Sequence, residues 1–210
     1  MSRVESVRVA TIENPLRLAV FISGSGSGMQ ALLHHQESKP CLHQTTLVLS
    51  NVAGVTGLDK AKSHNINTVT IELDKSITDR TKRREAHERT IMTVLEEHGI
   101  EAVILSGYMR ILSPLFVRAW QGRLLNIHPS LLPKYSGGMD TNVHEEVLRN
   151  GDRETGCTIH FVTEEVDAGP ILIQKKCAVA VWDTVESLKK RVQQMEGLAL
   201  IEAIEMIANT

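Results

Sequence analysis

Residues 17–28 read RLAVFISGSGSG, an apolar run that passes directly into alternating serines and glycines. The run has the composition of a buried strand, and the following residues 29–33, MQALL, have the pattern of a helix. A glycine-rich turn between a strand and a helix lets backbone N–H groups face an anion at the helix N-terminus. This stretch therefore predicts the first strand-loop-helix unit of an α/β fold, with a candidate phosphate site in its loop.

The rest of the chain continues this alternation of strand and helix patterns. We expect further strands at residues 45–49, 68–73, 102–105, 124–127, 157–162 and 171–179, and helices at 58–64, 79–98, 114–120 and 143–150. The helix at 114–120 is expected to begin at Ser113-Pro114, an N-cap followed by proline. A last helix is expected to open with the capping pattern Asp183-Thr184-Val185-Glu186. Strands separated by helices predict a mainly parallel sheet covered on both faces. The prediction is a single-domain, Rossmann-like α/β fold over residues 17–210, preceded by an N-terminal extension at 1–16.

Composition and charge narrow the range of partners. A chain of 210 residues with 42% hydrophobic content can bury one full core. Its formal net charge of −2 offers no field that would attract nucleic acid or an anionic membrane surface. Residues 1–6, MSRVES, lack the apolar core of a signal peptide. We therefore expect a cytoplasmic protein, a monomer or homodimer, that binds small molecules and neither nucleic acid nor membrane.

The cysteines give no indication of a disulfide framework or a metal centre. Cys41, Cys157 and Cys177 are odd in number, widely spaced and without a C-x-x-C pair. This pattern is typical of reduced, packed thiols in a cytosolic protein. The sequence therefore predicts no metal.

A second stretch, residues 125–133, reads LNIHPSLLP and contains an amide and an imidazole at the end of a predicted strand. Asn126 and His128 are two residues apart, so their side chains leave the same face of a strand. Pro129 has no N–H to donate and ends the ladder. With Asp167, which follows in the segment VDAGP, the stretch supplies the amide, imidazole and carboxylate that can move an acyl group without a metal. An ordinary buried strand end is the alternative for any single Asn-x-His.

The glycine loop fits some of its usual functions poorly. Its glycine spacing is wrong for a dinucleotide fingerprint, and the second strand ends in Ser50-Asn51 rather than in an acidic residue. A nucleophile elbow needs serine at the position of Gly26, and a P-loop needs a Lys-Ser or Lys-Thr ending. A monophosphate cradle and a plain structural turn both remain open.

Four stretches together resemble one family. They are residues 22–32, residues 107–112 (GYMRIL), residues 126–135 (NIHPSLLPKY) and residues 160–170 (HFVTEEVDAGP). In these stretches the chain is similar to the phosphoribosylglycinamide formyltransferases, folate-dependent enzymes of de novo purine (IMP) synthesis, over about residues 17–200. The resemblance implies 10-formyltetrahydrofolate as co-substrate, no metal, and transfer of its formyl group to the amine of 5-phosphoribosyl glycinamide.

The same resemblance implies the roles of individual residues. The implied catalytic residues are Asn126, His128 and Asp167. The implied substrate-binding residues are Gly26, Ser27, Gly28, Gln193, Gln194, Met195 and Glu196. The implied folate-binding residues are Arg84, Met109, Arg110, Ile111, Leu112, Asn126, Thr163, Glu164, Glu165, Val166 and Asp167. The chain departs from the family at Gly28, where asparagine is usual, and in residues 136–142, which are longer than the common Pro-Gly loop. His160 is expected to brace the site.

Three alternatives were weighed against this function. A formyltetrahydrofolate deformylase carries an N-terminal regulatory domain, whereas the catalytic pattern here begins near Arg17. A methionyl-tRNA formyltransferase needs a C-terminal tRNA-binding domain and a basic surface, whereas this sequence ends at Thr210 and has a negative net charge. A non-enzymatic phosphate-binding or nucleotide-binding module would not need an amide, an imidazole and a carboxylate together. We therefore expect the transferase.

Overall fold

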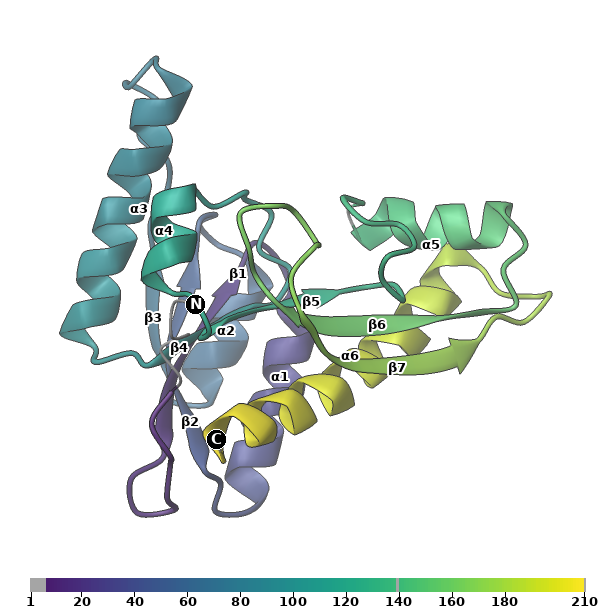
Figure 1. The fold of residues 1–210 in the computed structure, drawn as a ribbon, viewed down its shortest axis with the longest axis horizontal. Coiled ribbons are helices and arrows are strands. Elements are labelled where there is room, and N and C mark those ends of the chain that lie inside the picture. The colour runs from purple at the N-terminus through teal and green to yellow at the C-terminus, as the bar shows by residue number, and fades with distance from the viewer. Residues whose placement is uncertain (1–6, 139, 210) are drawn as a thin grey trace.

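The computed structural model describes residues 7–138 and 140–209. The strands in the described residues are β1 (Leu16–Ile22), β2 (His43–Ser50), β3 (Asn67–Thr70), β4 (Ala102–Leu105), β5 (Leu124–His128), β6 (Glu154–Phe161) and β7 (Ile171–Ala178). They form one sheet in the order β3-β2-β1-β4-β5-β6-β7 (Figure 1). The five strands from β3 to β5 pair in parallel, while β6 and β7 pair antiparallel. The predicted mainly parallel sheet is confirmed.

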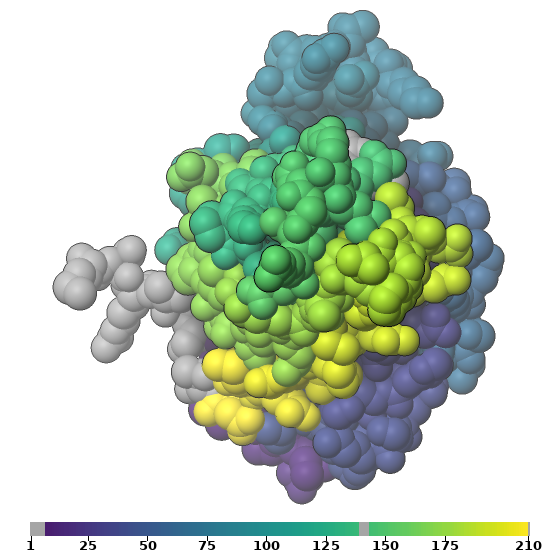
Figure 2. Space-filling model, turned by 90° about the vertical axis from the view of Figure 1, so that its right-hand side faces the viewer, coloured from purple at the N-terminus to yellow at the C-terminus, as the bar shows by residue number. Residues whose placement is uncertain are grey.

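Helices cover both faces of this sheet. In the described residues they are α1 (Ser27–Ser38), α2 (Thr56–Ser63), α3 (Arg80–Glu97), α4 (Pro114–Ala119), α5 (Asp140–Arg149) and α6 (Val185–Ala208). Buried side chains of α1, α2, α5 and α6 join one hydrophobic core, and those of α3 and α4 join a second core on the opposite face. In Figure 1 α6 runs in yellow beside α1 and across β6 and β7. Figure 2 shows α5 in green on the side of the molecule turned toward the viewer.

The first strand shows why its sequence is an unbroken apolar run. Leu18 and Val20 are buried in the core beneath α1 and α6, whereas Ala19 and Phe21 are buried in the core beneath α3 and α4. Successive side chains of a strand point to opposite faces, so a strand covered on both faces needs apolar residues at every position. The centroid of the Phe21 ring lies 5.3 Å from that of Tyr108 in an edge-on contact.

Two predicted helix starts can be compared with the structure. Ser113 caps α4 as predicted, because its hydroxyl accepts the backbone N–H of Phe116 at 3.3 Å, and Pro114 follows as the first helical residue. The cap of α6 lies one residue later than the pattern beginning at Asp183 suggests. Thr184 is the N-cap and Ser187 completes the capping box. Asp183 instead accepts from the guanidinium of Arg191 at 2.6 Å, an ion pair that a local pattern does not reveal.

The strand expected at residues 68–73 is shorter in the structure. β3 is an edge strand that pairs with β2 alone, and their register ends where Ser50 meets Thr70. Residues 71–73 lie beyond this parallel register and outside the strand. The other expected strands and helices are present, with ends that differ by a few residues.

The described part of the predicted N-terminal extension packs against the domain. Val7 and Ala10 are buried in the core beneath α1 and α6. The guanidinium of Arg8 donates to both carboxylate oxygens of Glu101, at 2.5 and 2.9 Å. Residues 1–6 lie outside the described residues, as does Met139 in the long loop. None of the helices in the described ranges is both long enough and apolar enough to cross a membrane.

Candidate active site

A cavity of about 430 Å³ lies at the carboxyl ends of β1, β4 and β5. Its lining consists of residues 23–27, 105–112, 126–129 and 162–164, with Val117, Gly137, Gly138, His160, Val166, Asp167, Lys189, Gln193 and Glu196. The carboxyl ends of parallel strands are where open α/β sheets bind their ligands. The cavity is therefore the candidate functional site.

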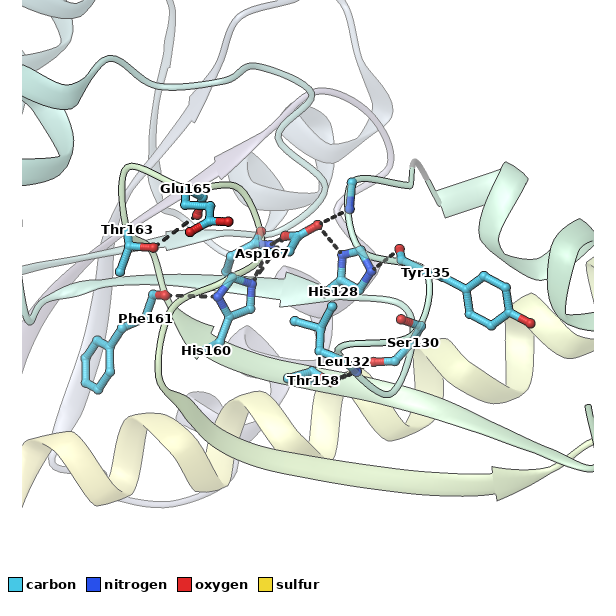
Figure 3. Close-up of polar contacts among 12 residues, drawn as sticks. His128, Ser130, Leu132, Tyr135, Thr158, His160, Phe161, Thr163, Glu165 and Asp167 are labelled. Carbon is cyan, nitrogen blue, oxygen red and sulfur yellow. Dashed lines mark hydrogen bonds and ion pairs between the residues drawn. The ribbon is translucent and has the colours of Figure 1, made fainter.

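Three predicted residues, Asn126, His128 and Asp167, meet at one wall of this cavity, and we name them the Asn-His-Asp group. Asn126 and His128 lie on β5. Asp167 lies in the loop between β6 and β7 and faces His128 (Figure 3). One oxygen of Asp167, Oδ2, is 3.3 Å from Nδ1 of His128. The other, Oδ1, accepts from the side-chain amide of Asn126 at 3.5 Å. The structure thus brings together residues that are 41 positions apart in the chain.

His160 holds the same carboxylate from the neighbouring strand. It lies opposite Asn126 in the register of β5 and β6. Its Nδ1 is 2.9 Å from the carbonyl oxygen of Phe161, which can only accept, so this nitrogen carries the proton. Its Nε2 is then free to accept from the amide of Asn126 at 3.1 Å, and it lies 3.5 Å from Oδ1 of Asp167. These contacts match the bracing role expected for His160.

His128 has acceptors on both sides of its ring. Nε2 lies 3.0 Å from the carbonyl oxygen of Tyr135, and Nδ1 faces Asp167. A neutral imidazole donates from one nitrogen only, so only the protonated ring satisfies both acceptors. Burial opposes that charge and lowers the pKa of His128 below its ordinary value, while Asp167 and the Tyr135 carbonyl act in the opposite direction. The ring is therefore neutral at pH 7 but has two acceptors ready for a second proton.

Asp167 is held as a carboxylate in a constrained backbone. Burial raises its pKa, but the contact with His160, the hydrogen bond from the backbone N–H of Gly137 and the charge of His128 outweigh this effect and place the pKa below its ordinary value. The Gly137 N–H donates to Oδ2 at 2.8 Å. Asp167 has a φ of +56°, a left-handed conformation that aspartate adopts more readily than bulkier residues. Loop geometry therefore aims this carboxylate at β5.

The loop of residues 130–138 supplies backbone atoms to the same centre. Its first turn is anchored by Thr158 of β6, whose hydroxyl accepts the N–H of Leu132 at 3.0 Å and donates to the carbonyl of Ser130 at 2.7 Å. From this base the loop delivers the Tyr135 carbonyl to His128 and the Gly137 N–H to Asp167. Figure 3 shows Thr158 beside Leu132 and Ser130, and the Tyr135 carbonyl beside His128.

The glycine loop forms a second wall of the cavity. Gly26 is the N-cap of α1 with a φ of +60°, and no side chain caps this helix end. The first N–H groups of an uncapped helix are unsatisfied donors that suit an anion. Gly28 is buried within α1 and does not line the cavity. A Cβ at position 28 would lie 2.9 Å from Oγ of Ser106, so the family's asparagine does not fit here without a shift.

We expect Gly26→Val to weaken ribonucleotide or phosphate binding by at least about tenfold. Valine is a rare outlier at positive φ, and its Cβ would lie 3.0 Å from Cε of Met29. Gly24→Ala is the control, because a Cβ there has no heavy atom within 4 Å among the described residues. Calorimetric titration of both folded variants checks the expectation. Unchanged affinity in Gly26→Val would place the phosphate elsewhere.

Two of the four substrate-binding residues predicted on α6 line the cavity. Gln193 and Glu196 are three residues apart and therefore share a helix face. Gln194 is exposed, and Met195 packs against the hydrophobic core, so both point elsewhere. Lys189, which was not predicted, lines the cavity one turn earlier on α6. The helix period could have identified it from Gln193.

Most of the predicted folate-binding residues surround the cavity. Residues 109–112, Thr163, Glu164, Val166 and Asp167 line it. Glu165 lies in the same loop outside the lining, and its carbonyl accepts from the Thr163 hydroxyl at 3.0 Å. Arg84 lies on α3 and also falls outside the lining. Direct contact with a ligand in this cavity is therefore not supported for Arg84 or Glu165.

Ser23 and Ser106 line the cavity although the sequence analysis assigned them no role. Both follow the last residue of a parallel strand, as the polar residues after β5 do, and this position is the signal that could have found them. The hydroxyl of Ser23 accepts the backbone N–H of Met109 at 2.8 Å. It thereby ties the glycine loop to the segment after β4.

The fold and the site define an α/β enzyme that handles an acyl group at the carboxyl edge of its sheet. The sequence model of the formyl transferase family matches residues 16–204. The chain belongs to this family, which implies a folate-derived formyl donor.

Named relatives agree with this membership. The phosphoribosylglycinamide formyltransferase of Escherichia coli is 40% identical over 181 residues, which cover 86% of this chain and 82% of that protein. The trifunctional purine biosynthetic protein adenosine-3 of Gallus gallus is 44% identical over 196 residues, which cover 93% of this chain. The chain spans only 19% of the length of that protein.

Solved structures share the fold. Glycinamide ribonucleotide transformylase 1 from Symbiobacterium toebii superposes with a TM-score of 0.84 at 33% identity, covering 99% of this chain and 93% of that one. Phosphoribosylglycinamide formyltransferase from Brucella melitensis has a TM-score of 0.84 at 37% identity, covering 93% of this chain and 97% of that one.

Proposed function

We propose that this protein transfers the formyl group of 10-formyltetrahydrofolate to the amine of 5-phosphoribosyl glycinamide, a step of purine biosynthesis. The observation that carries the proposal is the Asn-His-Asp group at the cavity wall, beside an uncapped helix N-terminus suited to a phosphate. The names of the relatives from Escherichia coli and Gallus gallus support the choice of donor and acceptor.

The cavity offers separate places for the two substrates. The ribonucleotide phosphate binds at Gly26 and Ser27, and Gln193 and Glu196 contact its ribose and glycinamide end. The folate lies against residues 109–112 and the 162–167 segment, whose exposed Ile111 and Val166 give its ring an apolar surface. The formyl group then lies between them, at the Asn-His-Asp group.

In the chemical step the glycinamide amine forms a bond to the formyl carbon, and the formyl oxygen becomes an oxyanion. Asn126 donates an amide N–H to this oxyanion, and one such donor contributes roughly 10²–10³ in rate. Neutral His128 takes the proton from the attacking amine at Nε2, which turns from the Tyr135 carbonyl to the substrate, and, once charged, also stabilises the oxyanion. The carbon-nitrogen bond to the folate then breaks, and His128 returns the proton to the leaving folate nitrogen.

The Asp167 carboxylate faces Nδ1 of His128, so it stabilises the charged imidazolium that forms when His128 takes the proton of the amine. His160 is a positioning residue that acts through Asp167 and Asn126.

The proposed reaction needs no metal at this site. As further proposals, the catalytic domain spans residues 17–210 with residues 1–16 as an extension, and the protein works in the cytoplasm as a monomer or homodimer. Its partners are its two small-molecule substrates, and nucleic acid and membranes are not among them.

The main alternative is a deformylase, in which water takes the place of the amine. An assay with 10-formyltetrahydrofolate and the ribonucleotide, the ribonucleoside without phosphate, or water as acceptor distinguishes the two. We expect formyl transfer to the ribonucleotide and little release of folate in its absence. Hydrolysis as the dominant reaction would assign a deformylase, and binding without turnover would assign a nucleotide-binding module.

The pH dependence of kcat/KM tests the state of His128. The neutral imidazole is the active form, and its pKa lies below the ordinary 6.5. We expect kcat/KM to rise from low pH to a plateau, with an apparent pKa below 6.5 for the free enzyme. A midpoint above pH 7 would contradict the assignment of His128 as the proton acceptor.

A further inference from the structure

Three side chains with metal-binding atoms meet near the amino end of β2, whereas the active site lies at the carboxyl ends of the strands. His35 lies in the last turn of α1, Cys41 in the turn that follows, and His43 is the first residue of β2. Their ligand atoms all lie within 4.8 Å of one another. The rings of His35 and His43 are stacked, with an interplanar angle of 8°. We call these residues the His-Cys-His cluster.

The cluster contains buried polar atoms that lack a partner. Within residues 7–138 and 140–209, Nε2 of His35 and Nε2 of His43 are both buried and make no hydrogen bond. His43 is only 1% exposed. Buried polar atoms are almost always hydrogen-bonded, so two imidazole nitrogens that lack a hydrogen bond and lie beside a thiol can bind a ligand.

A carboxylate stands next to the cluster. Oε1 of Glu205 on α6 is 3.4 Å from Nε2 of His35. Two nitrogen or oxygen ligands of one tetrahedral zinc ion lie about 3.3 Å apart, given bonds of about 2.0–2.1 Å. His35 and Glu205 already have this spacing. The ligand atoms of Cys41 and His43 lie within 4.8 Å of that of His35 and must move closer to reach zinc-binding distances.

We propose that the protein binds one divalent cation of the zinc type through His35, Cys41 and His43, with Glu205 as the fourth ligand. A thiolate, two imidazoles and a carboxylate form a ligand set that suits zinc rather than magnesium or calcium. On binding, the Cys41 thiol releases its proton to solvent. A cavity of about 300 Å³ that reaches Cys41 and His43 provides an entry path.

Gln36 makes the proposal more specific. Its Oε1 accepts the backbone N–H of Thr45 at 3.1 Å, so its amide nitrogen faces Nδ1 of His43 at 2.8 Å and donates to it. In the metal-free protein the ring proton is therefore on Nε2. Metal binding moves this proton to Nδ1, where an acceptor is required. A carboxylate at position 36 would accept from both Thr45 and His43, so Gln36→Glu should tighten zinc binding by about tenfold.

The cluster is separate from the catalytic centre. Ser27 at the start of α1 lines the active-site cavity, and His35 lies eight residues further along the helix, roughly 12 Å at 1.5 Å per residue. A metal ion here would join the end of α1, the start of β2 and α6. We therefore expect it to raise the melting temperature and to leave kcat unchanged.

Calorimetric titration of zinc chloride into the 210-residue chain, freed of metal by a chelator, tests the proposal. We expect one zinc ion per chain in the wild type. Affinity should fall at least about tenfold in Cys41→Ser and in His43→Gln. Cys177→Ser is the matched control, because this half-buried thiol lies outside the cluster, and His128→Ala removes the active-site imidazole. Both should bind zinc as the wild type does.

The absorption spectrum of the cobalt-loaded wild type is a second measurement, and it does not require a variant to fold. Cobalt bound by Cys41 should produce a thiolate charge-transfer band in the near ultraviolet, absent in folded Cys41→Ser. No stoichiometric zinc binding, no such band, or loss of binding in His128→Ala would each overturn the proposal. Formyl transfer is measured separately, so this failure leaves the proposed function standing.

Discussion

Replacing Asp167 with asparagine is expected to lower kcat for formyl transfer by about 10²–10³. The carboxylate accepts from Gly137 with one oxygen and from the amide of Asn126 with the other, and it faces His128. An amide has one oxygen and one NH₂ group, so Gly137 or Asn126 must meet a donor. The charge that favours a proton on His128 is also lost. Because neither effect involves the folate ring, its KM should change by less than about threefold.

Glu165→Gln is the matched control for this variant. It makes the same change of charge in the same loop, two residues away, at a side chain outside the cavity lining. We expect wild-type turnover. His128→Ala and Asn126→Ala should fall in the same range as Asp167→Asn, and pairs of these substitutions should cost much less than the sum of the single effects. Steady-state kinetics at saturating substrate measure all of these variants. Near-normal turnover of Asp167→Asn at neutral pH would refute its role.

Gly169→Ala should cost about 3 kcal/mol of stability and most of the activity. A Cβ at this position would lie 1.8 Å from the carbonyl oxygen of Phe161, a backbone atom that cannot rotate away. The 162–170 loop must therefore shift relative to β6. Asp167 is two residues from the substitution, so the shift moves the carboxylate away from β5. Thermal unfolding measures the first effect and kcat at low temperature measures the second.

Gly156→Ala separates the two effects. Its Cβ would meet the carbonyl oxygen of Lys175 at 1.9 Å, an equally severe clash, but between β6 and β7 and beside Leu131, whose Cδ2 would lie at 3.0 Å, rather than in the Asp167 loop. We expect a similar loss of stability with kcat largely retained in the protein that remains folded. Equal losses of kcat in the two variants would show that instability alone explains the effect of Gly169→Ala.

Fold class was predictable because local patterns and tertiary packing agree. β4 occupies residues 102–105 as expected, since four consecutive apolar residues fit a strand buried on both faces. α4 begins at its predicted cap because serine followed by proline specifies a helix start by itself. The predicted end of β3 was wrong, because the end of this strand depends on where the neighbouring strand β2 stops and not on the sequence of β3.

The site was predictable where a side chain carries the chemistry. Asn126 and His128 could be paired from the period of a strand, whereas their distance from Asp167 depends on a loop with a left-handed residue. The N–H of Gly137 and the carbonyl of Tyr135 could not be found, because every residue has these groups and composition does not mark them. On α6 a continuous range, residues 193–196, was assigned, and within it only Gln193 and Glu196 line the cavity.

The backbone contacts of the 130–138 loop make the site sensitive to length rather than to residue type. Tyr135 and Gly137 reach His128 and Asp167 through a carbonyl and an N–H, which most substitutions preserve. Deleting one residue between Leu132, which Thr158 anchors, and Tyr135 would displace both groups by about 3.8 Å, the spacing of consecutive Cα atoms. Substitutions that keep the backbone conformation of this loop, including the left-handed Tyr135 and Gly137, are therefore chemically silent while its residue count is fixed. We expect length changes to be tolerated only outside residues 132–137.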